Sequence, residues 1–264
     1  CNKPYSGTEV IKDYGEEHRK TGSPIVYTSK DSVFQIAAHE EVIPIEELYT
    51  MCEIARELLV DEHAVARVIA RPFIGEPGNY TRTANRRDYS MDPFEHTLLD
   101  HLKEQGYDVI SVGKIYDIFN GSGLTKERHT ESNMDGVDQT LAFMKEEFHG
   151  LLFTNLVDFD ANFGHRRNVQ GYADALEAFD QRLPEIYDAM GEEDLLILAA
   201  DHGNDPNYTG TDHTRERVPV LLYHKGIKPR NFGVKRGFYH IAATIYDYLG
   251  AKGSARGESL LDKS

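Results

Sequence analysis

The strongest constraint on the fold of this chain is the regular alternation of apolar runs and helical stretches after residue 93. Continuous apolar strands separated by helices are typical of a sheet that is covered on both faces. The sequence therefore predicts a three-layer α/β domain over residues 93–264. The predicted strands are 108–112, 151–157, 194–200 and 218–223, and the predicted helices are 94–104, 135–147, 171–189 and 239–249.

The first 92 residues have a different pattern. Polar, turn-rich stretches separate short apolar runs, of which 25–27 and 65–69 are predicted strands. Residues 45–59 carry apolar side chains at helical spacing and are predicted to form a helix. We therefore expect a smaller α+β domain over residues 1–92.

The composition excludes several classes of function. The 264 residues hold 29 Lys and Arg against 44 Asp and Glu, a net charge of −15. Bulk electrostatics at this charge disfavour nucleic acid and anionic membranes as partners. No apolar run approaches the ~20 residues that span a bilayer, and two cysteines, Cys1 and Cys52, exclude a disulfide framework. We expect a cytoplasmic protein.

Acidic residues and histidines follow two of the predicted strands. Asp160 and His165 come after the strand that ends at residue 157, whereas Asp201 and His202 come directly after the next strand, and His213 follows them. Ligands gather beyond the carboxyl ends of strands in such sheets. Mixed carboxylate and imidazole ligands suit Mn²⁺ or Zn²⁺ better than Ca²⁺. The sequence therefore predicts a divalent metal site at one edge of one sheet.

Two ions are compatible with this pattern. The consecutive residues Asp201 and His202 would point in different directions at a strand end, as two neighbouring ions require. Two metals ~4 Å apart can clamp a phosphoryl group and stabilise both its attacking and its leaving oxygen. The pattern thus indicates phosphoryl chemistry.

The longer motifs around these residues resemble those of the phosphopentomutase family, which belongs to the alkaline phosphatase superfamily. The resemblance runs from about residue 2 to the end of the last predicted helix. It implies an alkaline-phosphatase-like core with a smaller cap domain, formed here by residues 93–264 and 1–92. The matching segments are 6–9, 25–29, 35–41, 70–73, 75–78, 132–136, 155–160, 164–167, 201–206 and 210–216.

The resemblance implies an isomerase of nucleoside catabolism. The family interconverts α-D-ribose 1-phosphate and ribose 5-phosphate, and the equivalent 2-deoxyribose phosphates. It works through a phosphothreonine enzyme and a sugar bisphosphate intermediate over two Mn²⁺ ions. A sugar bisphosphate, either ribose 1,5-bisphosphate or glucose 1,6-bisphosphate, is the implied activator.

Site residues follow from the same resemblance. One ion would be held by Asp160, His165 and His213, and the other by Asp201, His202 and an aspartate that the family places before its cap. The implied substrate contacts are Ser29, Asp31, Val33, Arg67, Ile69 and Arg82 of the cap and Lys114 of the core. The arginines suit a phosphate group, because a guanidinium binds phosphate with two parallel hydrogen bonds.

The family also places its nucleophilic threonine before the cap, and no segment of this sequence matches that part. From this we expect a fragment that retains the cap and most of the metal site but lacks mutase activity on its own. We further expect a monomer.

Two other readings remain open. The chain could belong to a related metal-dependent phosphoglycerate mutase or phosphatase on the same core. It could also be a non-catalytic module that binds a metal or a sugar phosphate. Arg67 and Arg82, together with Asp31, suit a sugar phosphate, and the long motifs favour the phosphopentomutase family.

Overall fold

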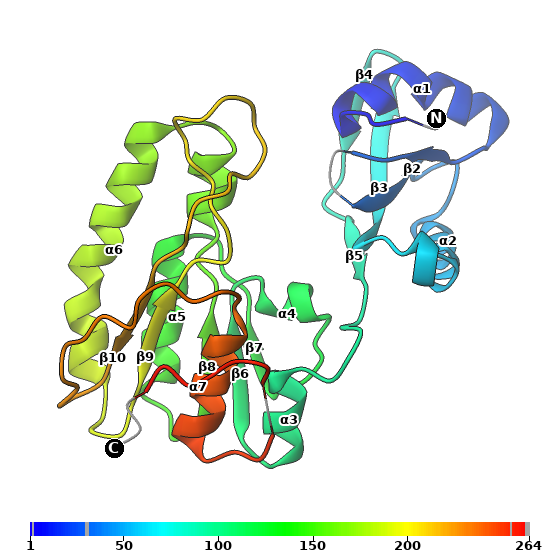
Figure 1. Cartoon of the computed structure of the whole chain (residues 1–264). Coiled ribbons are helices and arrows are strands. Elements are labelled where there is room, and N and C mark those ends of the chain that lie inside the picture. Colours follow the sequence, from blue (N-terminus) through cyan, green and yellow to red (C-terminus); the bar gives the residue numbers. More distant parts are fainter. Residues whose placement is uncertain (2, 30–31, 254, 262–264) are drawn as a thin grey trace. The chain divides into compact units, whose positions relative to one another are not determined.

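The computed structural model describes residues 1, 3–29, 32–253 and 255–261. The chain forms two compact units (Figure 1). The first consists of Cys1–Pro93 with Asp117–Asn120, and the second of Phe94–Tyr116 with Gly121–Ser264. Within the described part of the chain, no helix is both long and apolar enough to cross a membrane.

The first unit is built on a five-stranded sheet. Strand β2 pairs antiparallel with β1 and parallel with β3. Strand β3 is long enough for two further partners, since its first half pairs with β5 and its second half with β4, both antiparallel. The elements are α1 (Gly7–Thr21), β1 (Ile25–Tyr27), β2 (Val33–His39), α2 (Ile45–Leu58), the 3₁₀ turn Asp61–His63, β3 (Arg67–Glu76), β4 (Asn79–Arg82) and β5 (Arg87–Ser90).

One helix covers each face of this sheet. Because side chains alternate along a strand, Ala37 of β2 points to one face and its neighbours to the other. The α1 face buries Val10 and Ile11 of the helix with Tyr27, Ala37 and Phe73 of the sheet. The α2 face has a separate core, made of Ile36, Ala38, Ile43, Leu48, Cys52, Val68 and Ala70.

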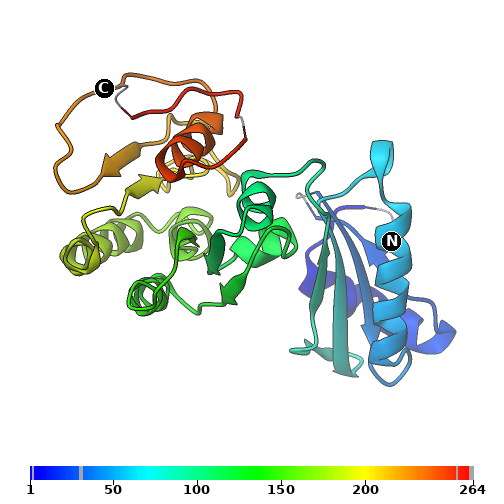
Figure 2. The same ribbon diagram turned by 90° about the horizontal axis from the view of Figure 1, so that it is seen from below.

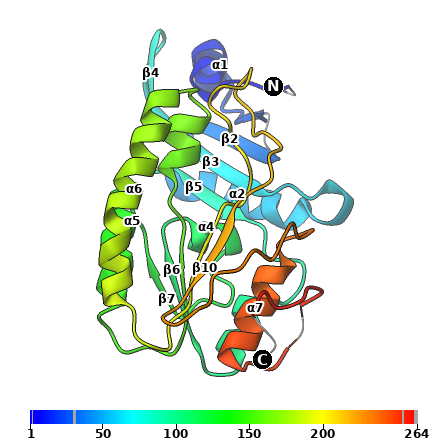
Figure 3. The same cartoon turned by 60° about the vertical axis from the view of Figure 1, so that its left-hand side comes forward.

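The second unit has its strands between two layers of helices. Figure 2 shows α5 and α6 on one side of the strands and α3 and α7 on the other. Helices α5 and α6 lie side by side (Figure 3). The elements are α3 (Leu98–Glu104), β6 (Asp108–Val112), the start of α4 (Ile115–Phe119, whose residues from Asp117 on belong to the first unit), β7 (Lys126–Arg128), α5 (Asn133–Phe143), β8 (Gly150–Thr154), α6 (Val169–Ala189), β9 (Leu196–Ala199), β10 (Val220–Tyr223) and α7 (Tyr239–Leu249).

The three-layer α/β class is confirmed, but the expectation of a single sheet is wrong. Strands β7, β6 and β8 form a parallel sheet, whereas β9 and β10 form an antiparallel pair of their own. Among the described residues, β8 and β9 share no hydrogen-bonded register. The apolar character of a strand indicates that it is buried, but it does not identify the strand's partner or direction.

A buried histidine makes the stability of the first unit depend on pH. His18 of α1 is 1% exposed. Its Nε2 accepts a hydrogen bond from the backbone N–H of His39 at 2.9 Å, and its Nδ1 lies 2.7 Å from the carbonyl oxygen of Ser23. Only the neutral ring with its proton on Nδ1 satisfies both contacts. Burial lowers the pKa of His18 accordingly.

We predict that acid destabilises the protein through this residue. The unfolded chain binds a proton at His18 below its ordinary pKa of about 6.5, while the folded chain resists protonation. The stability contributed by the neutral ring is therefore fully present above about pH 6.5, and it falls by at most about 1.4 kcal/mol per pH unit below that. Urea unfolding between pH 7.5 and 5 measures it. The variant His18→Leu should lose this part of the pH dependence, and an unchanged pH profile would contradict the assignment.

Candidate metal centre

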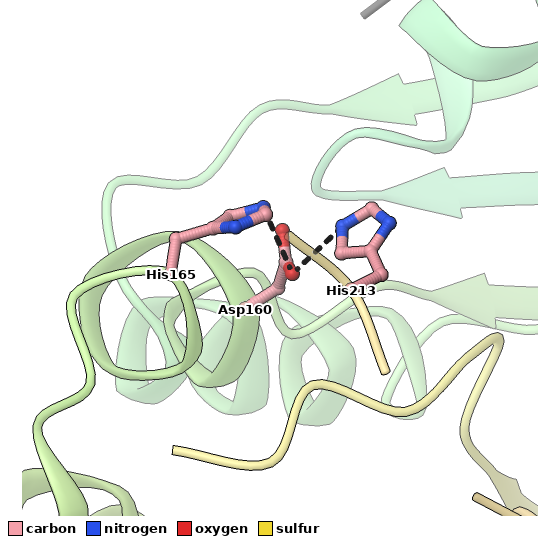
Figure 4. A group of neighbouring side chains, drawn as sticks. All are labelled: Asp160, His165 and His213. Atoms are coloured by element: carbon pink, nitrogen blue, oxygen red, sulfur yellow. Dashed lines mark ion pairs between the residues drawn. The ribbon is translucent and has the colours of Figure 1, made fainter. Parts of the chain in front are cut away.

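Three of the predicted ligands meet in the second unit. Asp160 and His165 lie in the segment after β8, and His213 lies in the loop after β9 (Figure 4). Each residue offers one ligand atom, and these atoms all lie within 4.8 Å of one another. Asp160 Oδ1 is 3.3 Å from His165 Nε2 and 3.2 Å from His213 Nε2. One carboxylate and two imidazoles suit a borderline divalent cation.

The local backbone explains how Asp160 and His165 come together. Residues Phe159–Gly164 form a π-helical turn, in which the backbone N–H of His165 donates to the carbonyl of Asp160 at 3.0 Å. Two residues five apart are neighbours on such a turn, whereas on an α-helix they diverge. The spacing of these two ligands therefore depends on an uncommon turn, of a kind that is frequent at functional sites.

The orientation of His165 fits a metal ligand. Its Nδ1 lies 2.6 Å from the carbonyl oxygen of Thr211. A carbonyl only accepts hydrogen bonds, so Nδ1 carries the proton, and in the neutral ring Nε2 keeps its lone pair on the side of Asp160, where a metal ion can take it. Metal-binding histidines are commonly held in this way, with the second ring nitrogen donating to a carbonyl or carboxylate.

Asn204 and Arg167 support the three ligands, and sequence reasoning assigned neither of them a role. Asn204 Nδ2 donates to Asp160 Oδ1 at 2.7 Å, and Arg167 Nη1 donates to Asn204 Oδ1 at 2.8 Å. Arg167 also donates to the backbone carbonyls of Asp205 and Asp212, at 2.8 and 2.7 Å. The guanidinium thus fastens the loop that carries His213 to the segment that carries Asp160. The only sequence signal was its place in the Gly164–Arg167 motif.

The other predicted pair lies beside these three ligands. The rings of His202 and His213 stack with centroids 3.8 Å apart, and His202 Nε2 lies 3.5 Å from Asp201 Oδ2. A cavity of about 330 Å³ is lined by Asp201, His202, Glu216 and other residues between β9 and β10, and by Phe238 before α7. The role of this pair as ligands of a second ion stays a prediction.

Most of the expected substrate contacts lie on the sheet of the first unit. Arg67 and Ile69 are on β3, and Val33 and Arg82 begin β2 and end β4. Val33 and Ile69 are buried, and Ile69 lies between its strand partners Gln35 and Asp88. Ser29 is described just after β1, whereas Asp31 lies outside the described residues.

Arg67 and Lys114, two of the expected substrate contacts, differ in their surroundings. Arg67 Nη1 forms an ion pair with Asp88 at 3.3 Å. Lys114 is exposed and follows β6 in the second unit. That any of these residues contacts a substrate remains a prediction.

Comparison with known proteins assigns the chain to a family. The family model described as the metalloenzyme superfamily matches residues 24–253. A solved phosphoglycerate mutase of Leishmania mexicana shares the fold, with a TM-score of 0.50 and 19% identity over 61% of this chain and 38% of that one. The chain therefore has the fold of the metalloenzyme superfamily, a class of α/β enzymes.

Curated relatives narrow the assignment. The phosphopentomutase of Clostridioides difficile is 62% identical over 98% of this chain and 67% of its own length. That of Alkaliphilus metalliredigens is 60% identical over 98% of this chain and 66% of its own length. The chain belongs to the metalloenzyme superfamily and, within it, to the phosphopentomutase family. It spans about two thirds of the length of these relatives.

Proposed function

We propose that this chain supplies the metal-binding and sugar-phosphate-binding parts of a phosphopentomutase. The reaction is the interconversion of α-D-ribose 1-phosphate and ribose 5-phosphate, and of the 2-deoxyribose equivalents. The observation that carries the proposal is the 62% identity to a phosphopentomutase along 98% of the chain. The grouping of Asp160, His165 and His213 supports it, because these side chains could hold a metal ion. Phosphoryl transfer needs such a positive charge beside the phosphate oxygens.

Two Mn²⁺ ions are the proposed cofactors. Asp160, His165 and His213 would hold one, and Asp201 and His202 would contribute to the other. When bound, such ions neutralise and orient the phosphoryl oxygens. The protein's own part is to hold His165 Nε2 in place through Thr211, and to bind the phosphate end of the sugar through arginines of the first unit. The phosphothreonine intermediate and the bisphosphate activator belong to the proposed reaction of the whole enzyme.

We further propose a cytoplasmic monomer. The three grouped ligands come from one chain, so this part of the site needs no second copy. Cys52 is buried as a free thiol, and burial raises its pKa to about 12, which makes it unreactive.

Ligand discrimination tests the proposal. With Mn²⁺ present, calorimetry should show that ribose 5-phosphate binds at least ~10-fold more tightly than 3-phosphoglycerate, as expected for a site that hydrogen-bonds the sugar hydroxyls. The opposite preference would favour the phosphoglycerate mutase reading. Turnover of ribose 5-phosphate is measured on the protein purified from its natural source, with Mn²⁺ and a bisphosphate activator. Release of inorganic phosphate from ribose 5-phosphate without ribose 1-phosphate, followed by ³¹P NMR, would contradict the mutase.

A further inference from the structure

Two loops of the second unit are joined one residue beyond each of two histidines. Gly203 directly follows His202, and Thr214 directly follows His213. The backbone N–H of Thr214 donates to the carbonyl oxygen of Gly203 at 2.9 Å, which forms an isolated antiparallel bridge between the loops. The imidazole rings of the two histidines stack with centroids 3.8 Å apart. The bridge is therefore placed where it can fix both rings.

The hydroxyl of Thr214 strengthens this bridge. Thr214 is 8% exposed, and buried polar side chains are normally hydrogen-bonded. Its Oγ1 accepts a hydrogen bond from the backbone N–H of Asp205 at 2.7 Å and donates one to Glu216 Oε2 at 2.6 Å. A hydroxyl has one proton and two lone pairs, so it makes both contacts at once. One side chain thus ties the loop after His202 to the loop after His213.

Glu216 occupies the space that Gly203 leaves open. A Cβ at position 203 would collide with Glu216 Oε2 and would lie 2.9 Å from the backbone oxygen of Thr214. A larger residue at position 203 would therefore displace the Glu216 carboxylate or the bridge. The same carboxylate lines the cavity that Asp201 and His202 also line. Glu216 holds the loops together within reach of the predicted second ion.

The Gly203 carbonyl also faces the ring of His202. His202 Nδ1 lies 3.3 Å from this oxygen. A carbonyl only accepts hydrogen bonds, so Nδ1 carries the proton, and in the neutral ring Nε2 keeps its lone pair on the side of Asp201 Oδ2, 3.5 Å away. His165 is held in the same way by the carbonyl of Thr211. A partner of this kind sets the orientation of a metal-binding histidine.

We propose that Thr214 is a positioning residue that orients both His202 and His213, with Glu216 as its anchor. It acts on His213 through the chain, as the next residue. It acts on His202 through the Gly203 carbonyl, which accepts from the Thr214 N–H and from the ring. That His202 binds an ion rests on the proposed function.

Calorimetry with Mn²⁺ on the full chain tests the proposal. Thr214→Val keeps the shape of the side chain but leaves Asp205 N–H and Glu216 without the hydroxyl. It should weaken Mn²⁺ binding ~10–100-fold, the usual range for residues that orient metal ligands. Thr214→Ser keeps the hydroxyl and should recover most of the affinity. The matched control is Thr209→Val, which removes an exposed hydroxyl between the same two loops and should bind Mn²⁺ like the wild type.

The variant Glu216→Gln separates an anchor from a direct metal ligand. Glutamine still accepts a hydrogen bond from the Thr214 hydroxyl but carries no negative charge. An anchor therefore predicts an Mn²⁺ affinity much closer to the wild type than that of Asp160→Asn. A loss of more than ~100-fold, beyond the usual cost of changes outside the ligands, would make Glu216 a ligand and overturn its role as the anchor.

The electron paramagnetic resonance spectrum of bound Mn²⁺ separates positioning from folding. This spectrum depends on the symmetry of the ligands around the ion, whereas a lower stability does not change it in molecules that stay folded. At saturating Mn²⁺ the spectrum should change in Thr214→Val and stay unchanged in Thr214→Ser and Thr209→Val. A Thr214→Val variant that melts at a lower temperature but keeps the wild-type affinity and spectrum would overturn the proposal.

The failure of this inference can be told from the failure of the proposed function. If Thr214→Val binds Mn²⁺ as tightly as Thr209→Val while Asp160→Asn does not, the positioning role is wrong and the proposed function is untouched. If Thr214→Val loses Mn²⁺ affinity but 3-phosphoglycerate binds more tightly than ribose 5-phosphate, the positioning role stands and the pentose assignment fails.

Discussion

The variant Asp160→Asn is expected to lose Mn²⁺ affinity by more than ~100-fold, since even changes outside the ligands typically cost ~10–100-fold. Asp160 is the only carboxylate among the three grouped ligands, and both imidazole Nε2 atoms face its Oδ1, at 3.3 and 3.2 Å. Asparagine keeps the shape but removes the negative charge. The two imidazoles would remain as neutral ligands, too few to fix a catalytic ion.

Titration calorimetry with Mn²⁺ measures this effect. The matched control is Asp188→Asn, which makes the same change of charge at an exposed position of α6. The control should bind Mn²⁺ like the wild type, because a distant surface charge is screened by salt. Equal affinities for Asp160→Asn and Asp188→Asn would show that the three residues do not hold the ion.

The variant Arg167→Gln is expected to weaken Mn²⁺ binding by ~10–100-fold, the usual range for residues that position metal ligands. Arg167 contacts none of the three ligand side chains. It acts through Asn204, which it holds at 2.8 Å and which in turn donates to Asp160 at 2.7 Å. It also fixes the carbonyls of Asp205 and Asp212, and so the loop that carries His213.

Two further variants show whether Arg167→Gln weakens Mn²⁺ binding by disturbing the fold or by misplacing the metal ligands. Arg166→Gln changes the neighbouring exposed arginine and should leave Mn²⁺ affinity unchanged. Arg167→Lys keeps the charge but loses the forked geometry, so it should recover only part of the affinity. If Arg167→Lys binds as weakly as Arg167→Gln at an unchanged melting temperature, geometry alone matters. An Arg167→Gln variant that binds like Arg166→Gln would contradict the positioning role.

Several elements could be predicted from local pattern because their own residues determine them. The predicted strand 25–27 and helix 239–249 match β1 and α7, and the predicted helix 45–59 ends one residue beyond α2. The helix predicted over 94–104 begins only at Leu98. Thr97 caps it, with its backbone N–H bound to Asp100 at 2.8 Å, and this capping box overrides the earlier apolar residues.

Other elements depend on partners that are distant in the sequence. Helix α1 and strand β2 were not predicted, because α1 has a narrow apolar face and β2 contains the polar residues Gln35 and His39. Both are buried, and each is satisfied by a residue far along the chain, Arg71 and Gly75. Strand β3 was predicted only over 65–69, yet it continues past Pro72 to Glu76. Pro72 lies where the antiparallel neighbour changes from β5 to β4.

Some residues of the candidate site could likewise be predicted from the sequence, and others could not. The three grouped ligands have the residue types of metal ligands and follow apolar strands, whereas their assignment to one ion came from the resemblance to the phosphopentomutase family. Arg167 and Asn204 were not predicted, since their roles consist of hydrogen bonds across 37 and 44 residues of sequence. Asp158 also follows the strand predicted to end at residue 157, but its carboxylate accepts a hydrogen bond from the backbone N–H of Asn133 at 2.7 Å, at the start of α5.

The central claim is that Asp160, His165 and His213 hold a divalent metal ion. Diffraction at the manganese absorption edge, from crystals of this chain grown with Mn²⁺, tests it most directly. We predict an anomalous peak about 2.0–2.3 Å from the Asp160 carboxylate and from Nε2 of both histidines, the usual range for such ligands. Mn²⁺ bound elsewhere, with these three side chains hydrogen-bonded only to one another, would contradict the account.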